Sequence, residues 1–406
     1  MSNNLEKIKS LKQPGLGSVY DDTEIRAVEK ILRECIENNR MISLYTPEVD
    51  EFEKKAADYL GVKNAVAVSS CGTGLDIATQ AIGIGEGDEV ITTSITYQAT
   101  AVCVLRAGGR PIAADVEPDT MNIDFNDTEK KITSKTKAIF PMHYGGRPVD
   151  MDALYRLAKK YNLKIVEDAA HAMGSEYMGK KIGSANHISV FSFQSGKNIS
   201  TLGEGGLITT NDDELAEKMR LLRTFAVTTR KGYEDCKYPI SALKKDVVEV
   251  TSNYRMTPFQ AAVGITQLEK LESLLTKRIE FAKLLDDRLG DIEGITLCAP
   301  PENGRRHTYH LYPVILNPEI VGVARDDFLK ILNDEFGLLA NLHYPLWYRY
   351  SIFQERGYEW NQCPIAEELV DQKLFTLPIH PKFGADEANF IARAIRNAIA
   401  FAARQS

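Results

Sequence analysis

The sequence lacks a cysteine framework, a long apolar run and a secretion signal. Its six cysteines lie more than thirty residues apart and form no C-x-x-C pair, which argues against both disulfide and zinc frameworks. The longest apolar run, 398–403, is far shorter than the roughly 18 residues that span a bilayer. The amino terminus is polar and has no apolar signal core. We therefore expect a cytoplasmic protein with reduced thiols, no metal and no membrane contact.

The chain also lacks an excess of positive charge. It carries 49 Lys and Arg against 56 Asp and Glu, a net charge of −7. Nucleic-acid-binding proteins usually need a basic face, so this balance argues against a nucleic-acid partner. Hydrophobic residues make up 44% of the chain and charged residues 26%, which is ordinary for globular domains. A length of 406 residues allows roughly two or three domains.

Short apolar runs in the first half of the chain predict strands. Most are continuous runs of Val, Ile, Ala and Phe, as is typical of strands that are buried on both faces. The predicted strands are residues 64–69, 89–92, 111–114, 137–141, 164–167, 188–193 and 206–209. Helical patterns separate them, so the sequence predicts an α/β fold with a mostly parallel, seven-stranded sheet between helices.

The two ends of the chain add further helices. Residues 22–36 form an early helical pattern, in which apolar side chains fall on one stripe. A polar segment at 228–251 is longer than an ordinary connection, so it is either a functional flap or a mobile loop. A long helical pattern at 257–289 follows it. We expect a domain boundary near residue 265, with a large domain at 1–265 and a small C-terminal α/β domain at 266–406.

Lys197 is the first candidate for chemistry. It follows a predicted buried strand and precedes a glycine-rich return into the next strand. Most lysines after a strand are solvated surface residues. However, ligands of α/β sheets bind at the ends of strands, and an amine placed there can form a Schiff base with an aldehyde cofactor.

Asp168 and His171 form a second candidate group after the strand at 164–167. A carboxylate in this position is often only a helix cap. The functional alternative is an anion that keeps a pyridine nitrogen protonated and so makes the ring an electron sink. His171 is placed either to contact the phenolic oxygen of that ring or to fill the core.

A turn of small residues and an aromatic side chain complete the pattern. The segment with Gly72, Thr73 and Gly74 leads from a strand into a helix, where free backbone N–H groups bind phosphate. Taken alone, it is also compatible with a simple turn. Tyr97 lies just after the next predicted strand, where an aromatic ring can stack on a planar cofactor.

These segments together resemble the pyridoxal-phosphate-dependent sugar aminotransferases of the DegT type, in the fold-type I aminotransferase superfamily. The resemblance runs over nearly the whole chain, from residues 47–53 to 375–378. Its specific motifs are residues 145–148, 167–171, 189–206 and 252–257. The resemblance implies an aspartate-aminotransferase-like fold, a pyridoxal 5'-phosphate cofactor and a homodimer.

The resemblance also implies a role for each matching position. Lys197 would hold the cofactor and later move the proton, Asp168 would pair with the pyridinium nitrogen, and His171 would contact the phenolic oxygen. Tyr97 would stack on the ring, and Asn253 would reach the phosphate of the neighbouring subunit, so the sites would be shared across the dimer. The remaining cofactor contacts would come from Gly72, Thr73, Gly74, Ser192 and Gln194.

Two departures from the family pattern bear on the substrate. Most relatives have a histidine where Gln194 stands, and a glutamine there resembles the branch that acts on cyclitols and forms aminohydroxybenzoate. The loop from Lys197 to Gly203 is one residue longer than the common spacing, with Leu202 as the extra residue. For the substrate itself we expect contacts from Arg255, His343 and Tyr344, although the last two also fit an aromatic strand end packed in the small domain.

The resemblance implies a transaminase that moves an amino group from glutamate or glutamine to a keto sugar, nucleotide-linked or phosphorylated, in amino-sugar biosynthesis. Within the family, the alternatives are an inosose-type aminocyclitol aminotransferase and a dehydrating or aromatising enzyme of the aminohydroxybenzoate-synthase type. The dehydratases that resemble this family replace the lysine with histidine, so Lys197 argues against the dehydratases but not against an aromatising enzyme. A regulatory homologue that kept only the fold is a non-enzymatic alternative, and the presence of both Lys197 and Asp168 disfavours it.

Overall fold

The computed structural model describes residues 10–11, 14, 19–42, 46–229 and 245–404. A seven-stranded sheet lies at its centre, and its order is β1-β9-β8-β5-β4-β2-β3. The strands are β1 (Asn64–Val68), β2 (Glu89–Thr93), β3 (Arg110–Ala114), β4 (Thr136–Phe140), β5 (Lys164–Asp168), β8 (Ile188–Ser192) and β9 (Gly206–Thr210). Within this sheet only the pairings of β9 are antiparallel. The predicted sheet is confirmed, and each strand ends within one residue of its expected bounds.

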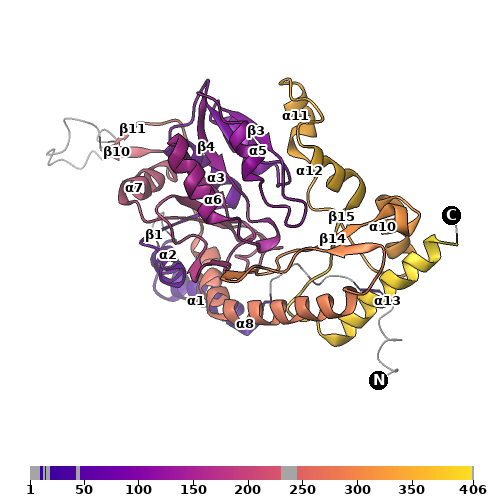
Figure 1. The fold of residues 1–406 in the computed structure, drawn as a ribbon. Helices are drawn as coiled ribbons and strands as arrows, with labels where there is room; N and C mark the ends of the chain where they lie inside the picture. The colour runs from indigo at the N-terminus through magenta and orange to yellow at the C-terminus, as the bar shows by residue number, and fades with distance from the viewer. Residues whose placement is uncertain (1–9, 12–13, 15–18, 43–45, 230–244, 405–406) are drawn as a thin grey trace.

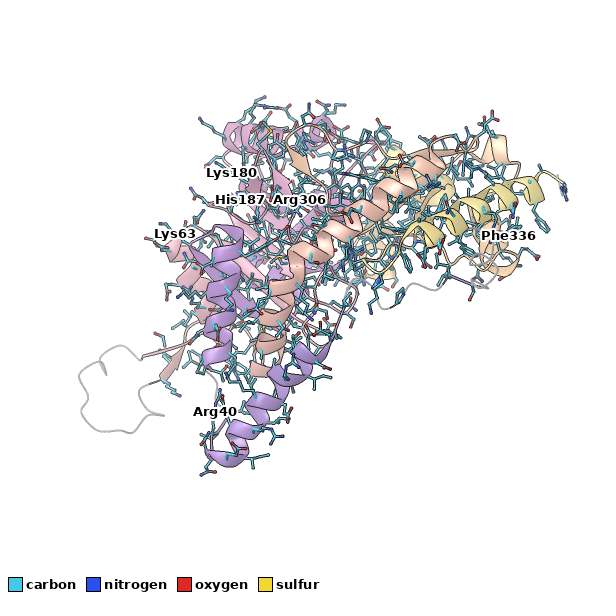
Figure 2. All side chains as sticks on the ribbon, turned by 90° about the horizontal axis from the view of Figure 1, so that it is seen from below. Arg40, Lys63, Lys180, His187, Arg306 and Phe336 are labelled. Atoms are coloured by element: carbon cyan, nitrogen blue, oxygen red, sulfur yellow. The ribbon has the colours of Figure 1, made fainter. Side chains whose placement is uncertain are left out.

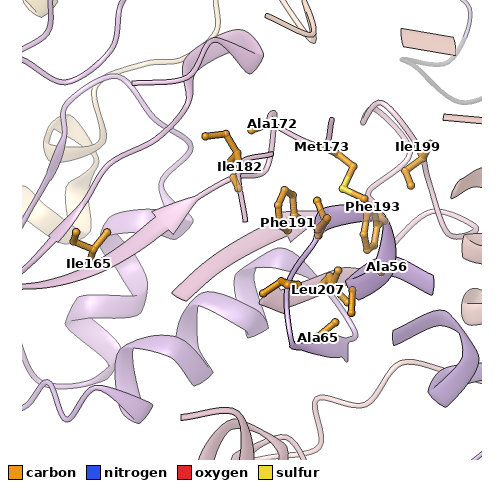
Figure 3. Close-up of a cluster of buried hydrophobic side chains, with 14 of the residues drawn as sticks. Ala56, Ala65, Ile165, Ala172, Met173, Ile182, Phe191, Phe193, Ile199 and Leu207 are labelled. Carbon is orange, nitrogen blue, oxygen red and sulfur yellow. The ribbon is translucent and has the colours of Figure 1, made fainter. Parts of the chain in front are cut away.

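Helices cover both faces of this sheet (Figure 1). Alternate strand residues enter two different cores, as expected for strands that are buried on both sides. One core takes α2 (Pro47–Leu60), α6 (Met151–Tyr161) and part of α8 (Pro258–Leu289). The other core takes α3 (Cys71–Ala81), α4 (Ala99–Arg106) and α7 (Asp213–Leu222). Figure 3 shows the first core around Phe191, Phe193 and Leu207, near the end of β8 that leads to Lys197.

The long helix α8 joins the two cores of the large sheet to a further core in the C-terminal part of the chain, the C-terminal core. Thr257 caps its start through a capping box with Gln260, and Pro258 stands at its first turn. Its buried residues up to Leu275 pack in the core that also contains α2 and α6, whereas those from Phe281 onward pack in the C-terminal core. Because the helix is continuous between them, the division into domains at residue 265 stays a prediction.

The C-terminal core is built on a small antiparallel sheet (Figure 1). Its strands are β12 (Ile295–Leu297), β14 (Tyr312–Leu316) and β15 (Leu374–Leu377). The helices α10 (Arg325–Asp334) and α13 (Ala385–Ala402) pack on it. A third sheet contains β6 (Glu176–Tyr177), β7 (Lys180–Lys181) and β13 (Arg305–Arg306). The shorter helical elements are α5 (Phe125–Lys130), η2 (Tyr144–Gly146), α9 (Pro318–Val321), η3 (Trp347–Arg349), α11 (Ser351–Gln354), α12 (Pro364–Glu368) and η4 (Leu369–Lys373).

The early helix α1 (Asp22–Glu37) exposes most of its apolar stripe. Asp21 and Glu24 form the capping box that starts it. Ile31 is buried, but Ile25 is 64% exposed and Ile36 is 81% exposed. Figure 2 shows α1 lying alongside α8, with Arg40 beyond its outer end. The chain therefore leaves an apolar helix face without cover from its own described residues.

The predicted flap begins and ends in a short ribbon. Strands β10 (Val227–Thr229) and β11 (Lys245–Val247) pair antiparallel, and residues 230–244 between them lie outside the described residues. Among the helices of the described ranges, none has the length and apolar character needed to cross a bilayer. The cytoplasmic location stays a prediction.

Candidate active site

The predicted site residues of the sheet gather at one edge. Strands β1, β2, β5 and β8 run in the same direction, so their carboxyl ends lie along the same side. Asp168 ends β5 and Ser192 ends β8. Tyr97 follows β2, and the turn with Gly72 follows β1. This is the edge at which parallel sheets bind ligands.

Lys197 lies in a tight turn after β8. Its backbone N–H donates to the carbonyl of Gln194 at 2.8 Å, and Ser195 N–H donates to the carbonyl of Gly203 at 3.0 Å. The side chain is half-buried. Burial lowers the pKa of Lys197, although the nearby Cys71 and Asp168 oppose the shift. The amine therefore loses its proton more readily than an ordinary lysine.

Asp168 presents a buried carboxylate near this amine, with 3% of the residue exposed. Thr100 Oγ1 donates to Asp168 Oδ2 at 2.6 Å, and Ala170 N–H donates to Oδ1 at 3.0 Å. Each oxygen keeps a further lone pair for another donor. The carboxylate is thus held from two sides and retains acceptor capacity.

His171 connects the edge of the large sheet with Tyr344 in the C-terminal part of the chain. Its Nδ1 accepts from Gly145 N–H at 3.3 Å, so we assign the ring proton to Nε2, which lies 2.9 Å from the Tyr344 hydroxyl. Burial, with the charges of Lys197 and His310, holds the pKa of His171 well below its ordinary value. The ring is therefore neutral at physiological pH.

Three residues from the C-terminal part of the chain, Tyr344, His343 and His310, reach this edge. The Tyr344 ring meets the Tyr97 ring edge to face at 5.9 Å. His343 bonds through Nδ1 to Thr376 Oγ1 at 2.8 Å, and burial lowers the pKa of His343 to about 4. The His310 ring packs against the His171 ring with 4.1 Å between ring centroids and 39° between the ring planes. Two of these residues, His343 and Tyr344, were predicted from the sequence, whereas His310 was not.

The turn before α3 offers backbone donors at a helix start. Ser70 caps the helix, and Thr73 N–H donates to Ser70 Oγ at 3.2 Å. Gly74 N–H already donates to the carbonyl of Ser70 at 3.1 Å. The amides of Cys71 and Gly72 belong to the first turn and lack intrahelical acceptors. These two donors are therefore the ones that the helix start offers to an anion.

Glycine is required where β9 passes this turn. A Cβ at Gly206 would lie 2.5 Å from Ser70 C and 2.7 Å from Cys71 N, so no larger residue fits without moving the turn. Gly74 packs just as closely, since its Cβ would lie 2.7 Å from Val190 Cγ1. The role of Gly74 in the structure is therefore close packing of α3 on β8.

Asn253 and Arg255 lie beside the same turn. Ser69 N–H donates to the carbonyl of Tyr254 at 2.8 Å, and Arg255 forms a bridge with Val68. Asn253 is exposed, with its Oδ1 accepting from Arg255 N–H at 3.3 Å. This segment therefore forms an outer rim of the turn.

Other predicted residues also stand at the rim. Tyr97 is 53% exposed, and Gln194 is exposed with Oε1 accepting from Gly196 N–H at 2.6 Å. Ser192 is buried at the end of β8, where it pairs with Gly206. The extra loop residue Leu202 has a φ of 61° and is 50% exposed. The loop thus takes up its additional residue by a left-handed turn on the surface.

The residues present fit pyridoxal 5'-phosphate. The cofactor needs an amine, an anion for its ring nitrogen and donors for its phosphate. Lys197, Asp168 and the amides of Cys71 and Gly72 supply these groups at one edge of the sheet. Within the ranges that the structure describes, no group of three or more His, Cys, Asp or Glu residues is suited to hold a metal.

Sequence reasoning missed Thr100 as well as His310. The hydrogen bond from Thr100 to Asp168 joins α4 to β5, which are far apart in sequence, so no local sequence pattern predicts it. His310 meets His171 only because two distant segments fold together. In the sequence, His310 stands out only by lying in a polar run before a strand. Such runs are common in loops, so the position does not indicate a site residue.

Comparison with known proteins places this arrangement in a family. Residues 22–396 match the model of the DegT/DnrJ/EryC1/StrS aminotransferase family. The GDP-perosamine synthase of Caulobacter vibrioides is 41% identical over 300 residues, which cover 74% of this chain and 77% of that protein. The structure is similar to Helicobacter pylori PseC, an aminotransferase involved in the biosynthesis of pseudoaminic acid, with a TM-score of 0.85, 29% identity and coverage of 96% and 100%. It is also similar to S. venezuelae DesV in complex with a ketimine intermediate, with a TM-score of 0.81, 31% identity and coverage of 93% and 94%.

Proposed function

Because the chain belongs to the DegT/DnrJ/EryC1/StrS aminotransferase family, we propose that it transfers an amino group from glutamate or glutamine to a keto sugar in amino-sugar biosynthesis. The observation that carries this proposal is the half-buried Lys197 with a lowered pKa close to the buried Asp168. The names of the similar GDP-perosamine synthase and PseC support a sugar as the acceptor.

The cofactor we propose is pyridoxal 5'-phosphate. When bound, it supplies an aldehyde that takes up the amino group and a ring that withdraws electrons. Asp168 would hold its ring nitrogen, and Tyr97 would cover its ring. His171 would contact its phenolic oxygen by exchanging the bond between Nε2 and the Tyr344 hydroxyl for one to the cofactor. The phosphate would be held by the hydroxyls of Thr73 and Ser192 and by the amides of Cys71 and Gly72, since the amides of Thr73 and Gly74 are engaged with Ser70.

Lys197 acts twice in this scheme. Its Nζ would hold the cofactor through the cofactor's aldehyde until the amino donor takes its place. The freed amine would then accept the proton of the donor's α-carbon at Nζ and pass it to the cofactor side, and it would move a proton in the opposite direction for the acceptor. Burial lowers the pKa of Lys197 and so raises the fraction of neutral amine that can do this near neutral pH.

The acceptor faces the small-domain side of the site. His343 and Tyr344 offer hydrogen bonds and a ring to a sugar, and Arg255 offers a cation to a phosphate or nucleotide diphosphate. Gln194 favours a second candidate acceptor, an inosose-type cyclitol, because the cyclitol-specific branch has glutamine at this position. A nucleotide-linked or phosphorylated keto sugar remains our first choice.

We also propose that the enzyme is a homodimer with shared sites. The exposed apolar face of α1 includes Ile25, Leu32 and Ile36, and such patches mark contact surfaces. Val250 is 93% exposed only three residues before Asn253. In this proposal a second copy covers these side chains, and its Asn253 contacts the phosphate of the neighbouring site, as the family resemblance implies.

The test is a half-reaction followed by absorbance. Protein loaded with pyridoxal 5'-phosphate is mixed with glutamate or glutamine, and the yellow colour should bleach. Added keto acceptor should restore it, and a panel of nucleotide-linked keto sugars, keto sugar phosphates and inosose identifies the acceptor class. A loaded protein whose spectrum does not respond to either donor would contradict the transaminase assignment.

A further inference from the structure

Two threonine hydroxyls stand behind the carboxylate of Asp168. Thr100 is fully buried in the first turn of α4, and its Oγ1 lies 2.6 Å from Asp168 Oδ2. Thr96, with 1% of the residue exposed, places its own Oγ1 2.9 Å from Thr100 Oγ1. Thr96, Thr100 and Asp168 thus form a buried chain of hydrogen bonds. Only its last member, Asp168, is a proposed cofactor contact.

The chemistry of the groups fixes the direction of this chain. A threonine hydroxyl has one proton, and an ionised carboxylate only accepts. The Thr100 hydroxyl has two acceptors within reach, Asp168 Oδ2 at 2.6 Å and the Tyr97 carbonyl at 3.2 Å, and we assign its proton to the much shorter contact with Asp168. Thr100 then accepts from Thr96. Thr96 has an alternative acceptor in the Met142 sulfur at 3.0 Å, but a thioether accepts weakly. A hydrogen bond to a charged acceptor is shorter and stronger than a neutral one, which fits the 2.6 Å distance.

The spacing of the two threonines ties this chain to Tyr97. The segment after β2 turns into α4, and Val102 N–H donates to the carbonyl of Gln98 at 2.9 Å. Thr96 lies in the bend before α4, and Thr100 lies in the first turn of the helix, so the bend brings their hydroxyls to within 2.9 Å of each other. Tyr97 lies between them and presents its ring at the rim of the site. One short segment thus carries both the ring-covering side chain and the hydroxyl that holds Asp168.

We propose that Thr100, backed by Thr96, is a positioning residue that keeps the Asp168 carboxylate aimed at the cofactor ring nitrogen. The inference rests on the proposed function. Without the Thr100 hydroxyl, Asp168 Oδ2 loses its buried donor, and the bond from Ala170 N–H to Oδ1 alone holds the carboxylate less firmly in its orientation. Tyr97 lies in the same segment as Thr96 and Thr100. The bond from Thr100 to Asp168 therefore also sets the position of the Tyr97 ring relative to the carboxylate.

The test compares Thr100→Val and Thr100→Ser with the matched control Thr92→Val. Thr92 is also fully buried in this sheet, and its hydroxyl donates at 3.0 Å to the carbonyl of Phe140 instead of to Asp168. The readouts are the dissociation constant of pyridoxal 5'-phosphate for the apo-protein, the pH profile of the absorbance of the bound cofactor, and the denaturation midpoint.

Loss of a hydrogen bond to a buried charge predicts about a ten- to hundredfold weaker cofactor affinity in Thr100→Val, with a shifted pH profile. Thr100→Ser restores both. Thr92→Val lowers the denaturation midpoint but binds the cofactor as the wild type does. Thr96→Val, which leaves the bond to Asp168 in place, weakens the affinity about two- to fivefold in the same direction and serves if Thr100→Val does not fold.

Two results would overturn this inference alone: wild-type affinity and pH profile in Thr100→Val or Thr96→Val, or an equal loss of affinity in Thr92→Val. A wild-type protein that does not bind pyridoxal 5'-phosphate would overturn the proposed function together with this inference.

Discussion

Replacing Gly206 with alanine is the sharpest perturbation of the phosphate turn. The added Cβ would lie 2.5 Å from Ser70 C, 2.6 Å from Ser70 O and 2.7 Å from Cys71 N. All three are backbone atoms, so no side-chain rotation relieves the contact. Either β9 or the turn must move, and overpacking of this kind costs about 1–3 kcal/mol of unfolding free energy.

The same displacement moves the amides that we assign to the phosphate. Gly206→Ala should therefore bind pyridoxal 5'-phosphate at least about tenfold more weakly, beyond its loss of stability, since charge-assisted hydrogen bonds depend on geometry. Urea denaturation gives the first quantity, and titration of the apo-protein with the cofactor gives the second.

Gly85→Ala is the matched control for this change. No heavy atom lies within 4 Å of a Cβ built at Gly85. A substitution at such a site changes the unfolding free energy by no more than about 0.5 kcal/mol. If Gly206→Ala behaves like Gly85→Ala in both measurements, the close approach of β9 to the turn does not shape the phosphate site.

Three further predictions follow from burial and exposure. Burial lowers the pKa of His307 to about 3 from an ordinary 6.5, so below pH 6.5 the unfolded chain takes up a proton that the folded chain does not. This group should therefore lower the unfolding free energy by up to about 1.4 kcal/mol per pH unit as the pH falls from 6 to 4. If denaturation curves of His307→Gln show the same pH dependence as the wild type, this prediction is wrong. Ile36→Glu on the exposed face of α1 should shift the protein to monomers in size-exclusion chromatography, whereas Ile320→Glu, at a site 52% exposed in the small-domain region, should not; equal behaviour of the two variants would rule out α1 as the contact. Tyr344→Phe removes the hydroxyl 2.9 Å from His171 Nε2 and should lower kcat about tenfold with the fold intact, and an unchanged kcat in steady-state assays would remove this bond from the mechanism.

The large sheet was predictable because its strands are buried on both faces. Such strands are continuous apolar runs, so the seven runs identified them to within one residue. Since the strands that carry site residues run in parallel, the positions of Asp168 and Lys197 near one edge followed from the same pattern. The chemistry at that edge, however, came from the resemblance of the motifs.

The contacts that hold these side chains were not predictable. Thr100 reaches Asp168, and His310 reaches His171, only through packing between elements that are far apart in sequence. The stripe on α1 illustrates a different limit. Its helical period was correct, but Ile25 and Ile36 are exposed, because periodicity indicates an apolar face without indicating what covers it.

The central claim is that the amine of Lys197 bonds the cofactor aldehyde at the edge of the sheet. Protein loaded with pyridoxal 5'-phosphate is reduced with borohydride, digested and mapped by mass spectrometry. We predict one pyridoxyl group per chain, on the peptide that contains Lys197, and none in Lys197→Arg. A label on another lysine, or an unlabelled Lys197 in a protein that has bound the cofactor, would contradict the account.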